Sequence, residues 1–438
     1  MQRLLMDALV EWKDNQKRKP LVLQGVRQCG KTYLLKEFGA QHYQDVLYCK
    51  FDGDEHLSGL FEQNLDPHRI IKDLSLYNNR DIKPGDTLII FDEVQSCGKA
   101  LTSLKYFYEE APEYHIIAAG SLLGVAVPKG TSFPVGKVEF LTLYPMNFYE
   151  FLLELNPMLA NHLRESPCND DAWRTFRVQL TEKYREYLIV GGMPEAVQAW
   201  VDTESIEKVE RIQDQIITSY ENDFGKHAPL SYFPKLSAIW GAIPSQLAKE
   251  NRKFIFSQVK KSWRAKDLED ALEWLMRSGL IYKVTNIEKP FLPLSAYANH
   301  TFFKLYLCDT GLLRRLAKLP ASVFFDKTEN YREFKGAMAE NYVCCELKRI
   351  FQQDIYYWTA QNPGQAEVEF VVQDDIYIIP IEVKAKSASH ARSLKRYCEL
   401  FNPKKSVLTS LEDVKENILP LYGFWDLRKW LDNLTPLT

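Results

Sequence analysis

Residues 25–32 read Gly25-Val26-Arg27-Gln28-Cys29-Gly30-Lys31-Thr32, which fits the pattern G-x-x-x-x-G-K-[ST] of a phosphate-binding P-loop. The apolar run Leu21–Leu23 comes just before it and is typical of a buried parallel strand. Leu34, Leu35 and Phe38 follow the loop at helical spacing. Strand, glycine loop and helix are the parts that a nucleotide-phosphate site needs, so the surrounding sequence supports the motif.

The residue types in the loop suit a triphosphate. Gly25 and Gly30 allow the backbone to turn so that its N–H groups face phosphate oxygens, and the following helix adds its positive end. Lys31 is predicted to bridge the β- and γ-phosphates of ATP, and the Thr32 hydroxyl is predicted to bind Mg²⁺. The predicted nucleotide-binding residues are therefore Gly25, Val26, Arg27, Gln28, Cys29, Gly30, Lys31 and Thr32, with Lys31 also catalytic.

A second apolar run, Leu88–Phe91, ends in Asp92 and Glu93. A buried strand here would deliver Asp92 to the Mg²⁺ ion and place Glu93 where it can act as the general base toward water. This order of motifs indicates ATP hydrolysis rather than phosphate binding alone. A third run, Ile116–Gly120, ends at Ser121, where AAA+-type ATPases carry a small polar residue that senses the γ-phosphate; a plain turn serine fits equally well.

Composition limits the protein class. At 438 residues the chain has room for two or three domains, and its net charge of −3 creates no overall field that would attract nucleic acid. The eight cysteines form no C-x-x-C pair, which is typical of reduced, non-metal cysteines and favours the cytoplasm. No apolar run reaches the length of a membrane span, and the N-terminus resembles an amphipathic helix rather than a signal peptide.

The fold class is α/β. Residues 20–145 alternate short apolar strands with helices, which predicts a parallel sheet with strands at 21–24, 46–51, 87–91, 115–119 and 138–143. Residues 147–230 turn helical and aromatic. A helix near 268–276 followed by strand-like runs at 280–284 and 302–308 suggests a winged helix, and residues 325–438 return to an α/β pattern.

A basic stretch at 252–266 precedes that helix. It contains six cations and no acid, with aromatic residues such as Phe256 and Trp263 interleaved; the cations are Arg252, Lys253, Lys260, Lys261, Arg264 and Lys266. On a near-neutral protein this is the best candidate for a DNA contact. A solvated helix face with core aromatics explains the pattern equally well, so both interpretations remain open.

A second acidic group lies in the last segment. Glu369 ends an alternating strand, and Glu382 and Lys384 form E-x-K on a second strand, where period 2 puts both side chains on one face. Two carboxylates with one lysine suit a Mg²⁺-dependent phosphodiesterase, and Glu340 on the preceding helix could supply a third metal ligand. A helix at 388–401 adds Arg392, Lys395 and Arg396 as phosphate partners for DNA.

The chain resembles the bacterial and archaeal AAA+-type P-loop ATPases that carry a C-terminal restriction-endonuclease-like domain of unknown function. The matching runs, in order, are 25–32, 88–95, 119–121, 143–146, 148–151, 187–188, 191–194, 303–306, 309–313, 340–342 and 381–384. The helical residues 151–229 are predicted to form a lid that follows an ATPase core at 1–150. The resemblance implies that this core is AAA+-like, that residues 230–324 form a winged-helix-like segment and that residues 325–438 form a PD-(D/E)xK-like domain.

Two positions depart from the family pattern. Glu369 stands where the family usually has aspartate, and its extra methylene alters metal geometry. Lys137, after Gly136, stands where the family often has arginine. Its ammonium is a single point charge, whereas an arginine guanidinium can donate two parallel hydrogen bonds to a phosphate.

These patterns lead to one function with one rival. The first interpretation is a Mg²⁺-dependent ATP hydrolase that acts on nucleic acid or is regulated by it, with Glu369, Glu382 and Lys384 as further catalytic candidates. The alternative is an ATP-dependent switch that binds a protein partner and keeps a degenerate nuclease fold for binding only. The sequence leaves open whether copies of the chain assemble into a homo-oligomer.

Overall fold

The structure is a computed structural model that describes residues 1–120, 134, 136–166, 171–249, 252–325, 332–360, 366–386, 391–411 and 418–433. Within these residues the chain divides into two compact units. The first unit comprises residues 1–144 with 277–279, and the second comprises 145–276 with 280–438. No helix in the described ranges is both long enough and apolar enough to cross a membrane.

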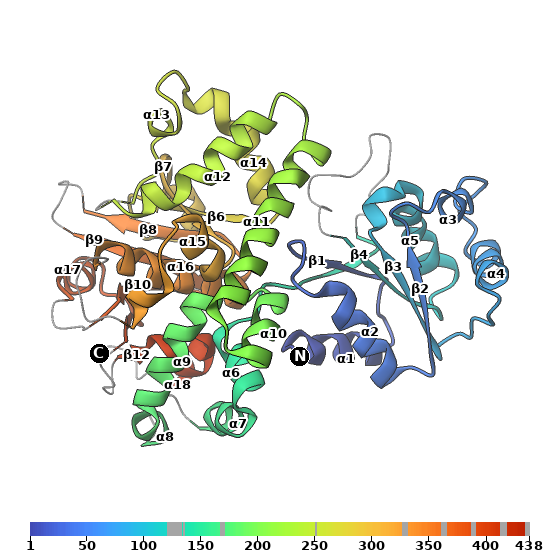
Figure 1. The fold of residues 1–438 in the computed structure, drawn as a ribbon, viewed down its shortest axis with the longest axis horizontal. Helices are drawn as coiled ribbons and strands as arrows, with labels where there is room; N and C mark the ends of the chain where they lie inside the picture. Colours follow the sequence, from blue (N-terminus) through green and yellow to red (C-terminus); the bar gives the residue numbers. More distant parts are fainter. Residues whose placement is uncertain are drawn as a thin grey trace. The chain divides into compact units, whose positions relative to one another are not determined.

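The first unit holds a parallel sheet. Its strands are β1 (Leu21–Gln24), β2 (Asp45–Lys50), β3 (Thr87–Asp92), β4 (His115–Ala119) and β5 (Glu139–Thr142). They lie in the order β2-β3-β4-β1-β5, and every pairing is parallel. This confirms the predicted parallel α/β core, shown in blue to cyan in Figure 1.

Helices connect these strands. They are α1 (Leu5–Asp14), α2 (Lys31–His42), α3 (Glu55–Gly59), α4 (Pro67–Asn78) and α5 (Gly98–Glu110), with a short 3₁₀ turn η1 (Val94–Ser96). Strands β3 and β4 are buried along their whole length, as expected for apolar strands covered on both faces. Because the sheet is parallel, β1 and β3 end at the same edge, and that edge carries the P-loop and Asp92.

The second unit begins with helices. They are α6 (Phe148–Leu155), α7 (Pro157–Glu165), α8 (Asp171–Thr175), α9 (Arg177–Val190), α10 (Pro194–Thr203), α11 (Ile206–His227), α12 (Phe233–Leu247), α13 (Phe256–Val259) and α14 (Ala265–Arg277). Later helices of this unit are α15 (Thr310–Leu316), α16 (Arg332–Phe351), α17 (Arg392–Phe401) and α18 (Leu427–Asn433). The predicted helical character of residues 151–229 is found.

A mixed sheet follows in the same unit. Its strands are β6 (Ile281–Ile287), β7 (Ala298–Leu307), β8 (Ile355–Thr359), β9 (Glu367–Asp374), β10 (Tyr377–Lys384), β11 (Val407–Ser410) and β12 (Leu419–Pro420). They lie in the order β12-β11-β10-β9-β8-β6-β7, drawn mainly in orange in Figure 1. Short 3₁₀ turns complete the unit at η2 (Leu294–Tyr297), η3 (Ala321–Phe324) and η4 (Leu421–Asp426).

The helix and the two strands predicted for the winged-helix segment are present as α14, β6 and β7, but the two strands belong to this larger sheet. The β6–β7 ribbon is not an isolated wing, because β6 pairs in parallel with β8, with Val284 level with Ile355. Strand β6 is buried along almost its whole length, so both of its edges need partners. The predicted boundary between residues 324 and 325 therefore falls inside one sheet, and the segments 230–324 and 325–438 share one compact unit.

Two of the motifs behind the family resemblance have a structural use in this unit. The Asp309 carboxylate caps α15 by accepting from Leu312 N at 2.9 Å, and it also accepts from Gly192 N at 2.6 Å. A Cβ atom on Gly192 would overlap the Met146 carbonyl oxygen, so glycine is required there. Burial raises the pKa of Asp309 to about 6, while the backbone N–H donors oppose that rise. The motifs at 191–194 and 309–313 thus hold together the start of α15, the turn between α9 and α10, and the segment just before α6 that contains Met146.

Candidate functional site: a phosphate-binding loop and its acidic strand

The loop between β1 and α2 has the backbone of a phosphate cradle. Gly25 has φ +150° and Gly30, the N-cap of α2, has φ +96°. Gln28 also has a positive φ of +62°, which is uncommon for a residue with a Cβ. A Cβ atom on Gly25 would overlap the Leu143 carbonyl oxygen, so glycine is required there by close approach as well as by conformation.

Lys31 points back into this loop. Its Nζ donates to the carbonyl oxygens of Gly25 and Val26, each at 2.9 Å, and the side chain is only 8 % exposed. The ammonium therefore lies inside the ring of backbone where a phosphate would sit, with loop carbonyls as its present partners. Cys29 is fully buried, so its thiol packs within the loop rather than facing solvent. Arg27 and Gln28 lie exposed at the loop tip.

Arg3 braces the loop, although the sequence analysis did not single it out. Its guanidinium donates to the Cys29 carbonyl at 2.9 Å and to the Tyr144 carbonyl at 2.5 Å, and the residue is buried. Nothing near position 3 in the sequence signals this interaction, because its partners lie 26 and 141 residues away.

Thr32 and Asp92 meet at the edge of the sheet. The Thr32 hydroxyl donates to Asp92 Oδ2 at 2.7 Å, and Tyr48 of β2 donates to the same oxygen at 2.7 Å. Burial and the Asp92 carboxylate raise the pKa of Tyr48, so its hydroxyl stays protonated at neutral pH.

These residues fit a Mg²⁺ ion. Because Thr32 gives its proton to Asp92, its oxygen lone pairs are available to a cation. Mg²⁺ in such sites takes one or two carboxylates plus phosphates and waters, so a threonine with a single aspartate is sufficient protein ligation. Among the described residues no group of three or more His, Cys, Asp or Glu side chains could hold a metal by itself.

Glu93 has an unusual backbone. Its φ of +52° is left-handed, and its N–H donates to Asp92 Oδ1 at 3.0 Å. The Gln95 amide donates to Glu93 Oε2 at 2.5 Å. A non-glycine residue in the left-handed region costs free energy and persists only where the surrounding structure holds it. Such residues cluster at functional sites. Gln95, which the sequence analysis missed, restrains the Glu93 carboxylate through this hydrogen bond.

Two other positions bear on the ATPase prediction, Ser121 and Lys137. Ser121 is outside the described residues. Lys137 forms an ion pair with Glu109 of α5 at 2.8 Å. It precedes β5, which runs parallel to β1 with Glu139 level with Leu21, so it lies at the sheet edge opposite the P-loop. Within this unit Lys137 therefore does not lie at the edge that carries the P-loop.

The C-terminal acids converge in part. Lys384 Nζ lies 2.6 Å from Glu382 Oε1, and Glu382 Oε2 accepts from Leu394 N at 2.7 Å. Glu369 of the neighbouring strand β9 accepts from Val383 N at 3.2 Å. Burial raises the pKa of Glu369; Lys384 opposes the rise and Glu382 adds to it. The structure thus brings Glu369, Glu382 and Lys384 together.

Glu340, the predicted third metal ligand, has other partners in this structure. It lies buried on α16, forms an ion pair with Arg252 and accepts from the Tyr306 hydroxyl at 3.0 Å. A buried carboxylate needs partners that compensate its charge, and Arg252 and Tyr306 provide them here. The described residues contain no metal-binding set of three acids in this unit either.

The basic stretch divides between interior and surface. Arg252 is held by Glu340, and Phe256 packs against Phe254 and Phe303. By contrast, Lys260, Lys261, Arg264 and Lys266 are exposed, with Lys260 Nζ 4.7 Å from the ring centre of Trp263. In the other predicted DNA-binding segment, α17 begins at Arg392 and exposes Arg392, Lys395 and Arg396.

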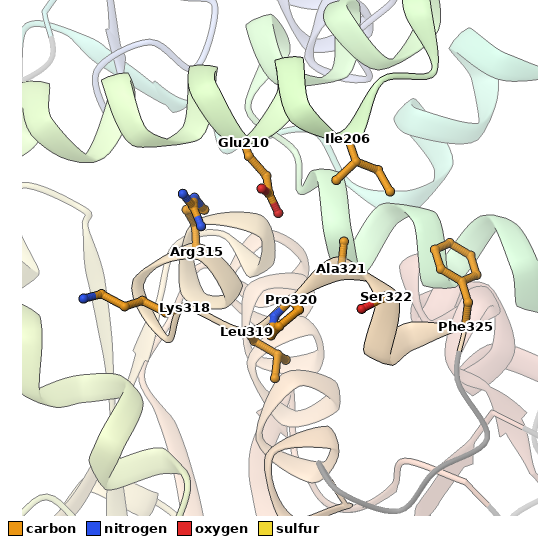
Figure 2. Close-up of a pocket in the computed structure, with 9 residues that line it drawn as sticks. All are labelled: Ile206, Glu210, Arg315, Lys318, Leu319, Pro320, Ala321, Ser322 and Phe325. Atoms are coloured by element: carbon orange, nitrogen blue, oxygen red, sulfur yellow. The ribbon is translucent and has the colours of Figure 1, made fainter.

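A cavity of about 630 Å³ lies between α11 and the segment after α15. Figure 2 shows Ile206 and Glu210 of α11 facing the 319–325 segment across it. Two of its charged residues are already paired, Arg315 with Asp214 at 2.7 Å and Glu210 with Arg314 at 2.8 Å. We assign no ligand to it.

Comparison with protein families separates the two units. Residues 17–152 match the family model described as an AAA domain. Residues 181–323 and 335–422 match two models described as domains of unknown function, DUF8612 and DUF4143. A curated relative is an uncharacterized protein of Methanocaldococcus jannaschii, 22 % identical over 432 residues that cover 93 % of this chain and 87 % of that protein.

Among solved structures, this chain is distantly similar to a Walker-type ATPase of Pyrococcus abyssi, with 14 % identity, a TM-score of 0.43, and coverage of 71 % of this chain and 94 % of that one. It also matches AMPPCP-bound DnaA of Aquifex aeolicus, with 16 % identity, a TM-score of 0.30, and coverage of 61 % and 75 %. The AAA match and the P-loop geometry together support ATP binding and hydrolysis by residues 17–152.

Proposed function

We propose that the first unit is a Mg²⁺-dependent ATPase whose activity is coupled to nucleic acid. One observation carries the ATPase proposal: the Lys31 ammonium lies inside the glycine loop, while Thr32 on the same helix is joined to Asp92 at the end of β3. A phosphate-binding cradle and a cation-binding pair therefore lie side by side, with Glu93 next in the chain.

The roles follow from chemistry. The loop N–H groups and Lys31 bind the phosphate oxygens, and Lys31 exchanges its hydrogen bonds to Gly25 and Val26 for hydrogen bonds to phosphate. Thr32 and Asp92 hold Mg²⁺, which when bound offsets the negative charge that develops on the transferred phosphoryl group. Glu93 accepts the proton of the attacking water.

The test is ATP turnover by the purified full-length chain. Phosphate release should require Mg²⁺, stop in EDTA, and change when double-stranded or single-stranded DNA is added. A chain that binds no ATP contradicts the ATPase proposal. Turnover that DNA leaves unchanged, together with no DNA binding, contradicts only the nucleic-acid part.

For nucleic acid, we expect the exposed end of the basic stretch to bind the DNA backbone. Replacing Lys260, Lys261 and Arg264 by alanine should weaken DNA binding, because neutralised phosphates release counterions and supply most of the sequence-independent affinity. The slope of log affinity against log salt should become shallower by about 0.9 for each phosphate that the variant no longer neutralises. Fluorescence anisotropy with labelled DNA at several salt concentrations measures both quantities.

The matched control removes the same charge from another surface. Lys208, Arg211 and Lys226 are exposed on α11, and their replacement by alanine should leave the salt slope unchanged. Equal reductions in affinity in the two triple variants would indicate a general charge effect and contradict DNA binding at 260–264.

A second candidate function is an ATP-dependent switch in which the nuclease-like group serves only for binding. The ion pair of Glu340 with Arg252 and the hydrogen bond that it accepts from Tyr306 support this candidate, because a metal would have to compete with both partners for the carboxylate. Glu382 Oε2 likewise accepts from Leu394 N, whereas Oε1 forms an ion pair with Lys384 but accepts no hydrogen bond.

On this second candidate function we expect no Mg²⁺- or Mn²⁺-dependent cleavage of DNA or RNA by the full-length chain, because a metal would have to displace Lys384, Leu394 N and Val383 N from the Glu369 and Glu382 carboxylates. Gel assays with both metals, with and without ATP, check this. Metal-dependent cleavage that disappears in Lys384→Ala would contradict the expectation and restore the nuclease interpretation.

A further inference from the structure

Tyr48 reaches the proposed Mg²⁺ site from a neighbouring strand. On the paired strands β2 and β3, Tyr48 is level with Ile90 and Lys50 is level with Asp92. Residues that are level on neighbouring strands point to the same face of a sheet, and so do residues two apart on one strand. Tyr48 therefore shares a face with Ile90, and Ile90 shares that face with Asp92. Its long side chain leans toward the carboxyl end of the sheet and brings the hydroxyl to 2.7 Å from Asp92 Oδ2.

We propose that Tyr48 is a positioning residue that holds the Asp92 carboxylate in the orientation required for Mg²⁺. This inference rests on the proposed ATPase function. Asp92 is 4 % exposed, and its oxygens accept from Thr32 and Tyr48 on one side and from Glu93 N on the other. Together these donors prevent rotation of the carboxylate about its last torsion.

The contribution of Tyr48 differs from that of the other two donors. Thr32 must use its oxygen on the cation, and Glu93 N belongs to the residue next to Asp92 in the chain. Tyr48 alone, of these three, comes from a strand that supplies no predicted ligand or catalytic residue. Outer hydrogen-bond partners of this kind orient metal ligands, and their removal typically lowers metal affinity about 10–100-fold.

The ring of Tyr48 makes a separate contact that does not involve its hydroxyl, so the hydroxyl can be removed while that contact is kept. Lys36 Nζ lies 4.0 Å from the ring centre. Lys36 is four residues after Thr32 on α2, so both side chains lie on the helix face that is turned toward β2 and β3. Phenylalanine at position 48 keeps this cation–π interaction and removes only the hydrogen bond to Asp92.

The experiment is a Mg²⁺ titration of full-length Tyr48→Phe bound to a fluorescent, non-hydrolysable ATP analogue. We expect the Mg²⁺ concentration at half-saturation to rise about 10-fold, and the affinity for the analogue in EDTA to equal that of the wild type. Tyr43→Phe is the matched control, because the Tyr43 hydroxyl lies 2.8 Å from His115 Nδ1 in the same unit and does not touch Asp92. It should titrate like the wild type.

Three other outcomes would each contradict the proposal. A wild-type Mg²⁺ titration in Tyr48→Phe shows that the hydroxyl does not position Asp92. An equal reduction of analogue affinity in EDTA shows a structural role for the tyrosine in the loop. If the wild-type chain binds no analogue under any condition, the ATPase proposal itself fails and this inference falls with it.

Discussion

Replacing Lys31 by alanine should abolish tight ATP binding. The Lys31 ammonium is nearly buried within the loop, where its present partners are the Gly25 and Val26 carbonyls. A bound triphosphate would take over these hydrogen bonds, and hydrogen bonds to charged groups contribute about 1.5–3 kcal/mol each. Because alanine can donate neither of the two, the affinity should fall by at least about 100-fold.

Calorimetric titration of the full-length chain with ATP and Mg²⁺ measures this reduction. Lys72→Ala, which removes an exposed lysine from α4 of the same unit, is the control and should bind like the wild type. Thermal unfolding of both variants separates a binding defect from a folding defect. An affinity in Lys31→Ala equal to that of the wild type would show that the lysine does not bind the phosphates.

Replacing Glu93 by glutamine should leave ATP bound but slow its hydrolysis about 10²–10⁴-fold, the range that general bases contribute. The amide is nearly the same shape, so the left-handed turn and the interaction with Gln95 can persist, while Thr32 and Asp92 still meet. The variant cannot accept a proton from water, and this alone distinguishes it from the wild type.

Single-turnover hydrolysis and nucleotide affinity, measured on the same preparation, test this separation. Glu113→Gln is a suitable control, because Glu113 is exposed and precedes β4, at the sheet edge opposite the site. If Glu93→Gln hydrolyses ATP at the wild-type rate, another group is the base. If it also fails to bind ATP, the residue supports the loop rather than the reaction.

The sequence alone was sufficient for the parallel sheet and for the main parts of the ATP site. The glycine loop, its lysine and threonine, and the apolar strand ending in Asp92 and Glu93 each sit in a run of adjacent residues. Local patterns of this kind can be read directly, because strand burial, helix spacing and glycine geometry all act over a few residues. The catalytic roles of these residues remain predictions until they are measured.

The tertiary structure decided everything that depends on residues far apart in the chain. Arg3 under the P-loop, Tyr48 beside Asp92 and Arg252 against Glu340 have no local signature, because each interaction forms only when separate elements pack. The β6–β7 ribbon looked like a wing because sequence periodicity shows that a strand is buried, but not which strand it pairs with. The same reason applies to Glu340: its residue type can be read from the sequence, whereas its partners Arg252 and Tyr306 are determined by packing.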